Sequence, residues 1–294
     1  MKTRRVNTLN VICYSAVAVF AILCILPFFL SISGSLSIQE DIIKYGYRLF
    51  PKHVSYLAYK ILFADFSRIG KAYEITIIVS LFGTILSVLI NSMMGYSLSR
   101  KNLRYMNLLS FYSLIPILFS GGMVPWYIVC VNYLHLKNNI LALIVPYLAS
   151  GWNIFLLRNF MKSIPEEMYE SAKIDGATEL GIFFRIMLPL AKPAIATVAL
   201  FTALGYWNDW WLGLMLIDKV EKQPLQMLLR TIISNVDFIK SSPNISEINR
   251  LYVSLPTESV KMAMGIITIG PIVFLYPFLQ RYFIKGIMIG AVKG

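Results

Sequence analysis

The sequence predicts an all-α, polytopic membrane protein with six transmembrane helices. Of its 294 residues, 57% are hydrophobic and only 14% are charged, and the mean hydropathy is +0.66. Soluble domains are about 45–50% apolar, so the composition favours a membrane protein. A helix needs about 20 apolar residues to cross the hydrocarbon core. Six apolar runs approach or exceed this length, at residues 11–32, 73–98, 108–131, 140–157, 194–217 and 262–283. No soluble domain is visible, so residues 1–294 are predicted to form a single transmembrane domain.

The net charge of +12 does not indicate nucleic acid as a partner. The Lys and Arg residues lie mainly at the ends of the apolar runs and in loops, where contact with lipid headgroups is expected. His53 and His135 fall in separate loops, and Cys13, Cys24 and Cys130 lack the spacing of metal ligands. We therefore expect neither a metal site nor a disulfide framework.

The first apolar run predicts a retained span that begins in the cytoplasm. It is longer than the apolar core of a cleavable signal peptide, which has about 7–15 residues, and a short basic tail precedes it. The short segment 99–107 carries Arg100, Lys101 and Arg104 without an acid, which favours the cytoplasmic side. Because the outer loops are also basic, the orientation depends on these two segments. Six spans then place both termini in the cytoplasm of a bacterial cell.

The middle spans carry signs of interior packing and of irregular structure. Asn91 and Gly95 are expected on the interior face of the second span. The third span contains Pro116, Gly121 and Pro125, so its helix is predicted to be broken. Irregular backbone at membrane depth is tolerated only where it is buried in protein or lines a wet cavity. The mixed segments 33–72 and 218–258 are predicted to be outer loops.

A polar segment, residues 158–193, separates the fourth and fifth spans on the predicted cytoplasmic side. Two short helices are predicted there. Gly176 suits the left-handed conformation that ends the first of them, and Glu170 is expected near that helix's end. The candidate capping residues are Ser163 with Glu166, as a capping box for the first helix, and Asp175 or Thr178 for the second.

The fifth span ends in an aromatic and polar cluster formed by Tyr206, Trp207, Asn208, Asp209 and Trp210. Aromatic rings stack on the apolar faces of sugars, and amides and carboxylates bind sugar hydroxyls, so the cluster suits a carbohydrate pathway. An aromatic belt at the membrane interface, with the acid paired to a neighbouring subunit, is the alternative interpretation and is slightly favoured. Asn153 and Asn91 complete the candidate pathway.

The sequence reveals no motif in this chain that could supply energy for transport. It has no G-x-x-x-x-G-K-[ST] phosphate loop and no series of intramembrane carboxylates or histidines such as proton-coupled carriers use. Glu74 is only the second residue of its span, so Asp209 is the only acid that we place well inside one. Energy for uphill transport must then come from another subunit, and no cofactor is expected in this chain.

The polar segment resembles the EAA loop of ABC-transporter permeases in its carbohydrate-uptake form. The residues that carry the resemblance are Glu170-Ser171-Ala172, Asp175-Gly176-Ala177, Phe184, Ile186 and Leu188-Pro189. Ser171 departs from the pattern, because the family usually has alanine there. Further features match the subgroup that imports oligosaccharides or polysaccharide fragments: Gly121-Gly122, Trp152-Asn153, Trp207-Asn208-Asp209 and Arg281–Gly286.

This resemblance implies an ABC importer permease fold and a permease subunit that is not itself an enzyme. The implied partners are a homologous second permease, two ATPases that bind ATP and Mg²⁺, an extracytoplasmic sugar-binding protein and an oligosaccharide. The resemblance assigns ATPase coupling to Glu167, Glu170, Ser171, Ala172, Asp175, Gly176, Ala177, Leu188 and Pro189. It also suggests that the tail after residue 280 reaches the ATPases. The alternatives are a secondary carrier or channel, and a membrane-embedded glycan enzyme.

Overall fold

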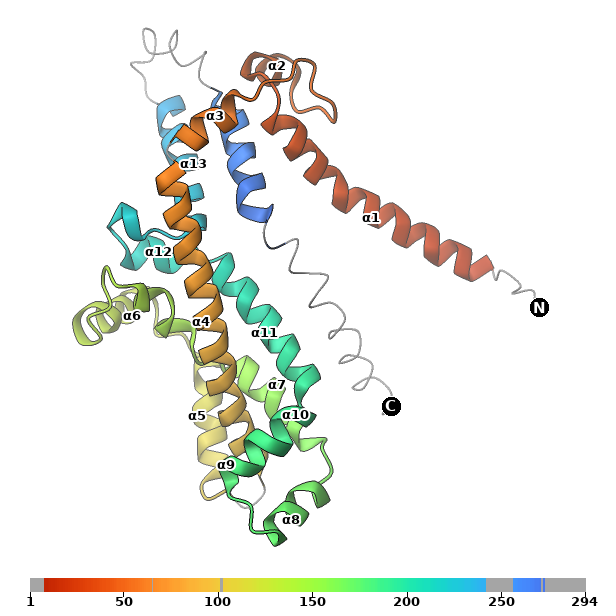
Figure 1. Ribbon diagram of the computed structural model, residues 1–294, viewed down its shortest axis with the longest axis vertical. Helices are drawn as coiled ribbons and strands as arrows, with labels where there is room; N and C mark the ends of the chain where they lie inside the picture. The colour runs from red at the N-terminus through yellow and green to blue at the C-terminus, as the bar shows by residue number, and fades with distance from the viewer. Residues whose placement is uncertain (1–7, 65, 101–102, 242–255, 271, 273–294) are drawn as a thin grey trace. The chain divides into compact units, whose positions relative to one another are not determined.

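The computed structural model describes residues 8–64, 66–100, 103–241, 256–270 and 272. The described residues are mainly helical, and the β-structure among them is an isolated bridge between Ser37 and Val54 (Figure 1). They form two compact units. The first contains the described parts of 1–69 and 229–270, and the second contains those of 70–228 and 271–294. The prediction of an all-α class is confirmed.

In the first unit, the predicted first span is a single helix, α1, Thr8–Ser35. Residues Val11–Ser35 are apolar enough to cross a membrane, and 0% of the most apolar part is buried within the protein. A helix that is apolar on all sides and uncovered by protein is stable only in lipid or beneath other protein. The structure thus supports a membrane span at this position.

The segment after α1 contains two short helices, α2, Gln39–Tyr45, and α3, Leu57–Ala64. Polar side chains bind it to the start of a helix at residues 257–270 of the same unit. Gln39 Nε2 donates to Thr257 Oγ1 at 2.9 Å, and Tyr47 donates to Glu258 at 2.8 Å. The predicted sixth span begins in this last helix, and most of its remainder, like the carboxyl-terminal tail, lies outside the described residues.

The second span is part of helix α4, Phe66–Ser99. At 1.5 Å per residue its 34 residues extend for about 51 Å, well beyond the roughly 30 Å of a hydrocarbon core. This excess length explains why α4 begins earlier than the predicted boundary at residue 73. Its first turns carry Arg68, Lys71 and Glu74, which a helix end outside the hydrocarbon can tolerate.

The third span is broken, as predicted. Helix α5, Met106–Leu118, ends before Gly121-Gly122, and α6, Met123–Ile128, continues as a π-helix, η1, Val129–Tyr133. The chain turns by 113° between the two parts. Gly122 has φ +83°, a left-handed conformation that glycine adopts without steric cost.

The fourth span is also broken, which the sequence analysis did not predict. Two 3₁₀ turns, η2, Ile140–Leu143, and η3, Val145–Tyr147, precede helix α7, Gly151–Lys162, at an angle of 49°. Pro146 lacks an N–H group, and the Ser150 side chain accepts a hydrogen bond from Asn153 N as α7 begins. The helix also continues past the expected end at residue 157.

The remaining elements divide the rest of the second unit into short pieces. They are α8, Glu167–Ile174; α9, Glu179–Ile182; the π-helix η4, Phe183–Met187; α10, Leu188–Leu190; α11, Lys192–Trp207; α12, Trp211–Leu216; η5, Val220–Lys222; and α13, Leu225–Ser241, which leaves this unit after residue 228. The predicted fifth span is therefore interrupted after Trp207. The loop expected at 218–258 contains α13, whose leucines at 225 and 228 are buried at helical spacing.

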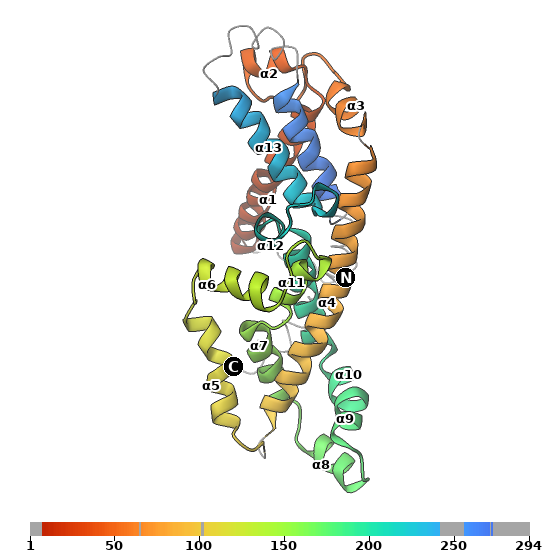
Figure 2. The same cartoon turned by 90° about the vertical axis from the view of Figure 1, so that its left-hand side faces the viewer.

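Two connecting segments of the second unit, around Asn138 and at residues 218–222, lie together. Asn138 Oδ1 accepts hydrogen bonds from Asp218 N and Lys219 N, at 2.8 and 3.2 Å, and Lys222 Nζ donates to the Asn138 carbonyl at 2.8 Å. The short helices α8 and α9 lie instead beside the carboxyl-terminal end of α4 (Figure 2).

Close packing against α4 depends on small residues. A Cβ atom at Gly83 would lie 2.7 Å from the ring of Tyr206, and one at Gly95 would lie 3.0 Å from Leu157 Cβ. Small residues allow transmembrane helices to approach closely and gain dispersion contacts. Helices α11 and α7 consequently pack directly against the backbone of α4.

We predict that Gly83→Ala destabilises the protein by about 1–3 kcal/mol, because the added methyl group overlaps a packed ring. Gly70→Ala is the matched control, since the same helix has open space within 4 Å of that position. The control should be neutral or up to about 1 kcal/mol more stable. Thermal unfolding of the purified protein measures both, and equal midpoints for the two variants would contradict the packing between α4 and α11.

Candidate functional site

The polar segment 158–193 forms two helices joined at Gly176, as predicted. Gly176 has φ +77°, and its N–H donates to the Lys173 carbonyl at 3.0 Å, while Ala177 N donates to the Ala172 carbonyl at 2.9 Å. This pair of hydrogen bonds is a Schellman motif, which satisfies the last carbonyls of a helix. Gly176 therefore ends α8 through a local backbone motif, and a glycine at this position of the sequence already predicts that motif.

The second helix begins at a side-chain cap. Thr178 Oγ1 accepts a hydrogen bond from Gly181 N at 3.2 Å, so of the two predicted candidates Thr178, rather than Asp175, caps α9. Downstream, Pro189 lies within α10, and an 82° bend separates residues 179–190 from α11.

Two expectations for the first helix were wrong. Ser163 does not form a capping box, because its hydroxyl donates to the Phe160 carbonyl at the end of α7. Glu170 lies in the first turn of α8 rather than near its end. The amino-terminal end of a helix dipole favours a carboxylate, so this position contributes to helix stability.

The segment presents large apolar side chains to its surroundings. Ile174 is 86% exposed and Leu180 is 61% exposed, and Met168 and Phe184 are about half exposed. Among the predicted coupling residues, Ala172 is buried against the core of the second unit, whereas Ala177, Leu188 and Pro189 are half-buried. The other predicted coupling residues, which are exposed, are Glu167, Glu170, Ser171, Asp175 and Gly176.

Glu179 is the centre of a cluster that sequence reasoning did not single out as a unit. Its carboxylate accepts hydrogen bonds from Tyr96 at 2.7 Å and Tyr169 at 2.8 Å, and Lys173 Nζ lies 2.8 Å away. The guanidinium of Arg100 stacks on the rings of both tyrosines, 5.1 and 4.8 Å from their centroids.

The electrostatics of this cluster favour the ionised form of Glu179. Partial burial opposes ionisation, but the hydrogen bonds from Lys173, Tyr96 and Tyr169 outweigh it and lower the pKa to about 2 from an ordinary value of 4.5. The stabilisation is therefore complete above about pH 4.5 and is lost as the pH falls toward the folded-state pKa. At neutral pH the carboxylate carries its full charge.

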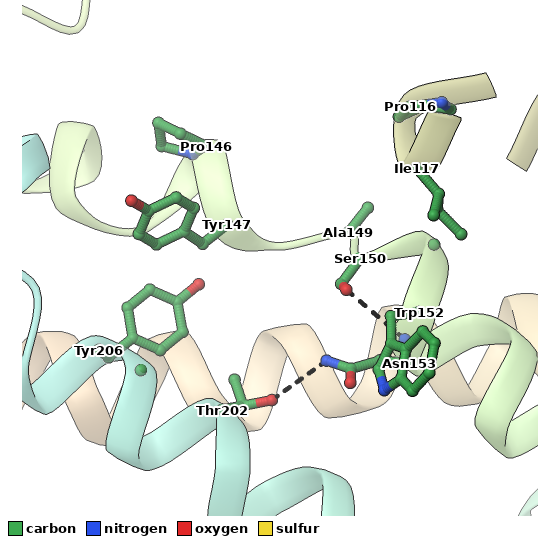
Figure 3. Close-up of a pocket in the computed structure, with 12 residues that line it drawn as sticks. Pro116, Ile117, Pro146, Tyr147, Ala149, Ser150, Trp152, Asn153, Thr202 and Tyr206 are labelled. Atoms are coloured by element: carbon green, nitrogen blue, oxygen red, sulfur yellow. Dashed lines mark hydrogen bonds between the residues drawn. The ribbon is translucent and has the colours of Figure 1, made fainter. Parts of the chain in front are cut away.

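A cavity of about 490 Å³ lies in the second unit, away from the polar segment, at the breaks in the third and fourth spans. Figure 3 shows Tyr147 and Tyr206 toward one side of it and Trp152 toward the other. The lining residues are Pro116, Ile117, Pro146, Tyr147, Ala149, Ser150, Gly151, Trp152, Asn153, Thr202, Gly205 and Tyr206. None of these side chains carries a charge.

Polar groups lie between the aromatic rings of the cavity. Asn153 Nδ2 lies 3.5 Å from Thr202 Oγ1, and Ser150 Oγ is nearby at the start of α7 (Figure 3). The rings of Tyr147 and Tyr206 are 6.2 Å apart and tilted by 53°. Aromatic faces with amide and hydroxyl groups between them suit a ligand that has both apolar faces and hydroxyls.

Of the predicted cluster on the fifth span, Tyr206 lines this cavity, whereas Trp207 is buried. Asp209 accepts a hydrogen bond from Tyr147 at 3.2 Å and another from Leu212 N at 3.1 Å. Its carboxylate thus has partners within the same chain, where it orients one cavity tyrosine and bonds to the first turn of α12. A second cavity, of about 600 Å³ beside Gly121-Gly122, shares Tyr147 with the first.

The remaining predicted pathway residues lie apart from the first cavity. Asn208 is exposed and accepts a hydrogen bond from Gln226 at 3.2 Å. Trp210 packs edge-on against Trp211 with ring centroids 5.8 Å apart. Both lie beyond the end of α11, so they do not extend the lining that Tyr206 and Asn153 contribute.

Asn91 lies behind the cavity wall and is fully buried at 0% exposure. Its Nδ2 donates to the Leu148 carbonyl at 2.9 Å and to the Ser87 carbonyl, and its Oδ1 accepts from Ser150 N at 2.9 Å. The amide satisfies two backbone groups of the irregular segment before α7. Asn91 therefore fixes the wall of the cavity without facing the space inside it.

Sequence reasoning missed several cavity residues, namely Tyr147, Ser150 and Thr202. Trp152 was noted only as part of a family pattern. The breaks at Pro146 and Gly151 were the available signal, because irregular backbone within an apolar run indicates a protein-lined cavity.

A helical membrane unit with a polar loop at one end of its longest helix and an uncharged, half-open cavity at its broken spans has the architecture of a transport permease. The comparisons agree. The family described as "Binding-protein-dependent transport system inner membrane component" matches residues 83–289. The chain belongs to this family, so it is a membrane permease of an ABC-type transport system and not an enzyme in its own right.

Two relatives from Bacillus subtilis (strain 168) cover nearly the whole chain. The polygalacturonan/rhamnogalacturonan transport system permease protein YtcP is 37% identical, over 97% of this chain and 98% of the relative. Protein LplC is 38% identical, over 92% and 90%. A crystal structure of a bacterial ABC transporter involved in the import of the acidic polysaccharide alginate contains a chain with a TM-score of 0.80 and 27% identity, over 96% of this chain and 99% of that one.

We predict that Asn91→Leu destabilises the complex and weakens transport. The substitution leaves the Leu148 carbonyl and Ser150 N without their buried partner, at a cost of about 1–3 kcal/mol each. Asn91→Asp keeps an acceptor for Ser150 N but turns a carboxylate oxygen toward the Leu148 carbonyl in a fully buried site, so it should be at least as harmful. The exposed Asn159→Leu is the control, and thermal unfolding is the measurement. A midpoint for Asn91→Leu equal to that of the control would show that water replaces the amide.

Proposed function

We propose that this chain is one of two homologous permease halves in an ATP-driven importer of oligosaccharides or polysaccharide fragments. In this proposal residues 1–294 form a single transmembrane domain with the six predicted spans. Two ATPases bind ATP and Mg²⁺ on the cytoplasmic side, and an extracytoplasmic binding protein delivers the sugar. Both chain termini lie in the cytoplasm of a bacterial cell, and segment 158–193 is the coupling loop.

The observation that carries the proposal is the lining of the 490 Å³ cavity. A carbohydrate ring has an apolar face that stacks on aromatic side chains and hydroxyls that need hydrogen-bond partners. Tyr147, Trp152 and Tyr206 offer aromatic faces, and Asn153 and Thr202 offer polar groups between them. Ionic ligands fit this wall less well, because its side chains carry no charge.

The exposed apolar face of the coupling loop supports its role as an ATPase contact. Ile174 and Leu180 would lie in water if the chain were alone. Docking of another protein would remove this apolar surface from water. Each Å² buried in this way would stabilise the assembly by about 25 cal/mol. The Schellman turn at Gly176 holds the two loop helices at a fixed angle for such a contact.

The contacts within the second unit also favour the proposed orientation. Arg100, from the acid-free basic segment, stacks on Tyr169 of the coupling loop. The two segments predicted to be cytoplasmic therefore lie on one side of the unit. Membership of a binding-protein-dependent transport family disfavours a secondary carrier or a glycan enzyme.

The cavity proposal predicts that Asn153→Ala raises the KM for oligosaccharide uptake. Loss of one or two hydrogen bonds to the sugar should weaken binding by about 2- to 10-fold. The full transporter in vesicles with its binding protein is the system to use. Asn159→Ala, on the same helix but outside the cavity lining, is the matched control. An unchanged KM for Asn153→Ala would remove this cavity from the sugar pathway.

The docking proposal predicts that Ile174→Ser lowers transport-coupled ATPase activity while leaving the fold intact. An 86% exposed side chain contributes little to the isolated permease, so thermal stability should stay within about 0.5 kcal/mol of the parent. Gly176→Pro, which cannot adopt φ +77°, should also uncouple hydrolysis from uptake. Normal coupling in both variants, in complexes of normal yield, would place the ATPase contact elsewhere.

A further inference from the structure

The Glu179 cluster joins segments that are distant in the chain. The carboxylate belongs to α9, Tyr169 and Lys173 belong to α8, and Tyr96 lies 83 positions away near the end of α4. A single side chain thus holds both helices of the coupling loop and the last turns of the longest helix in the second unit.

The cluster is built around one acid and two cations. Lys173 bonds to the carboxylate directly, and Arg100 lies over the rings of the tyrosines that donate to it. Removal of the acid would leave Lys173 without the anion that it contacts and the two phenol groups without their acceptor. The arrangement therefore requires a carboxylate at position 179. An amide there would turn its NH₂ group toward the donor groups that surround it.

Apolar packing holds the same elements beneath the polar contacts. Tyr96 is only 6% exposed, and its ring lies 5.4 Å from that of Phe183, next to the fully buried Ile182. The side chains of Glu179 and Lys173 are themselves 51% and 44% exposed, and contacts between exposed side chains open readily. The part-buried hydrogen bond from Tyr96 is therefore the contact that the packed base protects.

We propose that Glu179 is a positioning residue that fixes the coupling loop to α4, so that a displacement of the loop by the ATPase is passed to α4 as a rigid-body motion. This inference rests on the proposed docking of an ATPase on the loop. It adds a defined attachment of the loop to α4. The same helix carries Asn91, whose hydrogen bonds fix the cavity wall.

The first test compares substitutions in the complete transporter, reconstituted with its ATPases and binding protein. Glu179→Gln and Tyr96→Phe should each lower the number of sugar molecules imported per ATP hydrolysed by at least about threefold, with ATPase activity retained. Tyr96→Phe keeps the ring that packs on Phe183, so its effect does not depend on loss of the fold. Tyr105→Phe, at an exposed tyrosine, is the control and should leave the ratio unchanged.

The second test replaces the cluster with a covalent link. Tyr96→Cys and Glu179→Cys are combined in a chain whose natural cysteines, Cys13, Cys24 and Cys130, are substituted. The double variant should be uncoupled before treatment, and a short bis-maleimide that bridges the two thiols should restore coupled uptake. A bridged transporter that is blocked would show that loop and helix move relative to each other, which overturns the proposal.

The outcomes also separate this proposal from the one on which it rests. If the parent transporter shows no sugar-dependent ATPase activity, the proposed importer function fails. If the parent is coupled and both Glu179→Gln and Tyr96→Phe import as much sugar per ATP as the parent does, the importer function stands and the attachment at Glu179 fails.

Discussion

A row of small residues along α4 determines how closely the neighbouring helices of the second unit approach it. Gly83, Ser87, Asn91 and Gly95 recur at every fourth position, which places them on one face of the helix. At both ends of the row a neighbour lies so close that a Cβ atom would overlap it or nearly touch it. In a membrane, where lipid is as apolar as leucine, such close approach supplies the attraction between helices. The neighbouring elements are positioned by this face.

Close approach alone would leave the irregular backbone of the broken spans without hydrogen-bond partners. An unpaired peptide group away from water costs several kcal/mol in hydrocarbon, so broken helices persist only where protein supplies the partner. Asn91 does so for Leu148 and Ser150, from the middle of the small-residue row. The tyrosine hydroxyl of residue 206 does the same for the carbonyl of Ile144, at 2.9 Å. A cavity can therefore open at the breaks without exposing backbone to lipid.

The features that sequence could predict are those governed by local rules. The helix end at Gly176 follows from a glycine at a position that requires a positive φ, and the break in the third span follows from its glycines and prolines. The partners of Glu179 and Asn91 could not be predicted, because they lie up to 83 positions away and depend on which helix faces meet. Local patterns can also predict the wrong contact. Ser163 and Glu166 have the spacing of a capping box, but the Ser163 hydroxyl instead donates to the Phe160 carbonyl at the end of α7.

Helix α7 connects the cavity with the proposed coupling loop by its length. Gly151, Trp152 and Asn153 at its first turn line the cavity, and its last residues, from Arg158 to Lys162, belong to segment 158–193. Its 12 residues extend for about 18 Å, and between these ends Leu157 packs against Gly95 of α4. A rigid rod that packs against α4 between its ends moves together with that helix. Because packed interiors resist continuous deformation, a movement of α4 and α7 as one body would carry the loop and the cavity wall together.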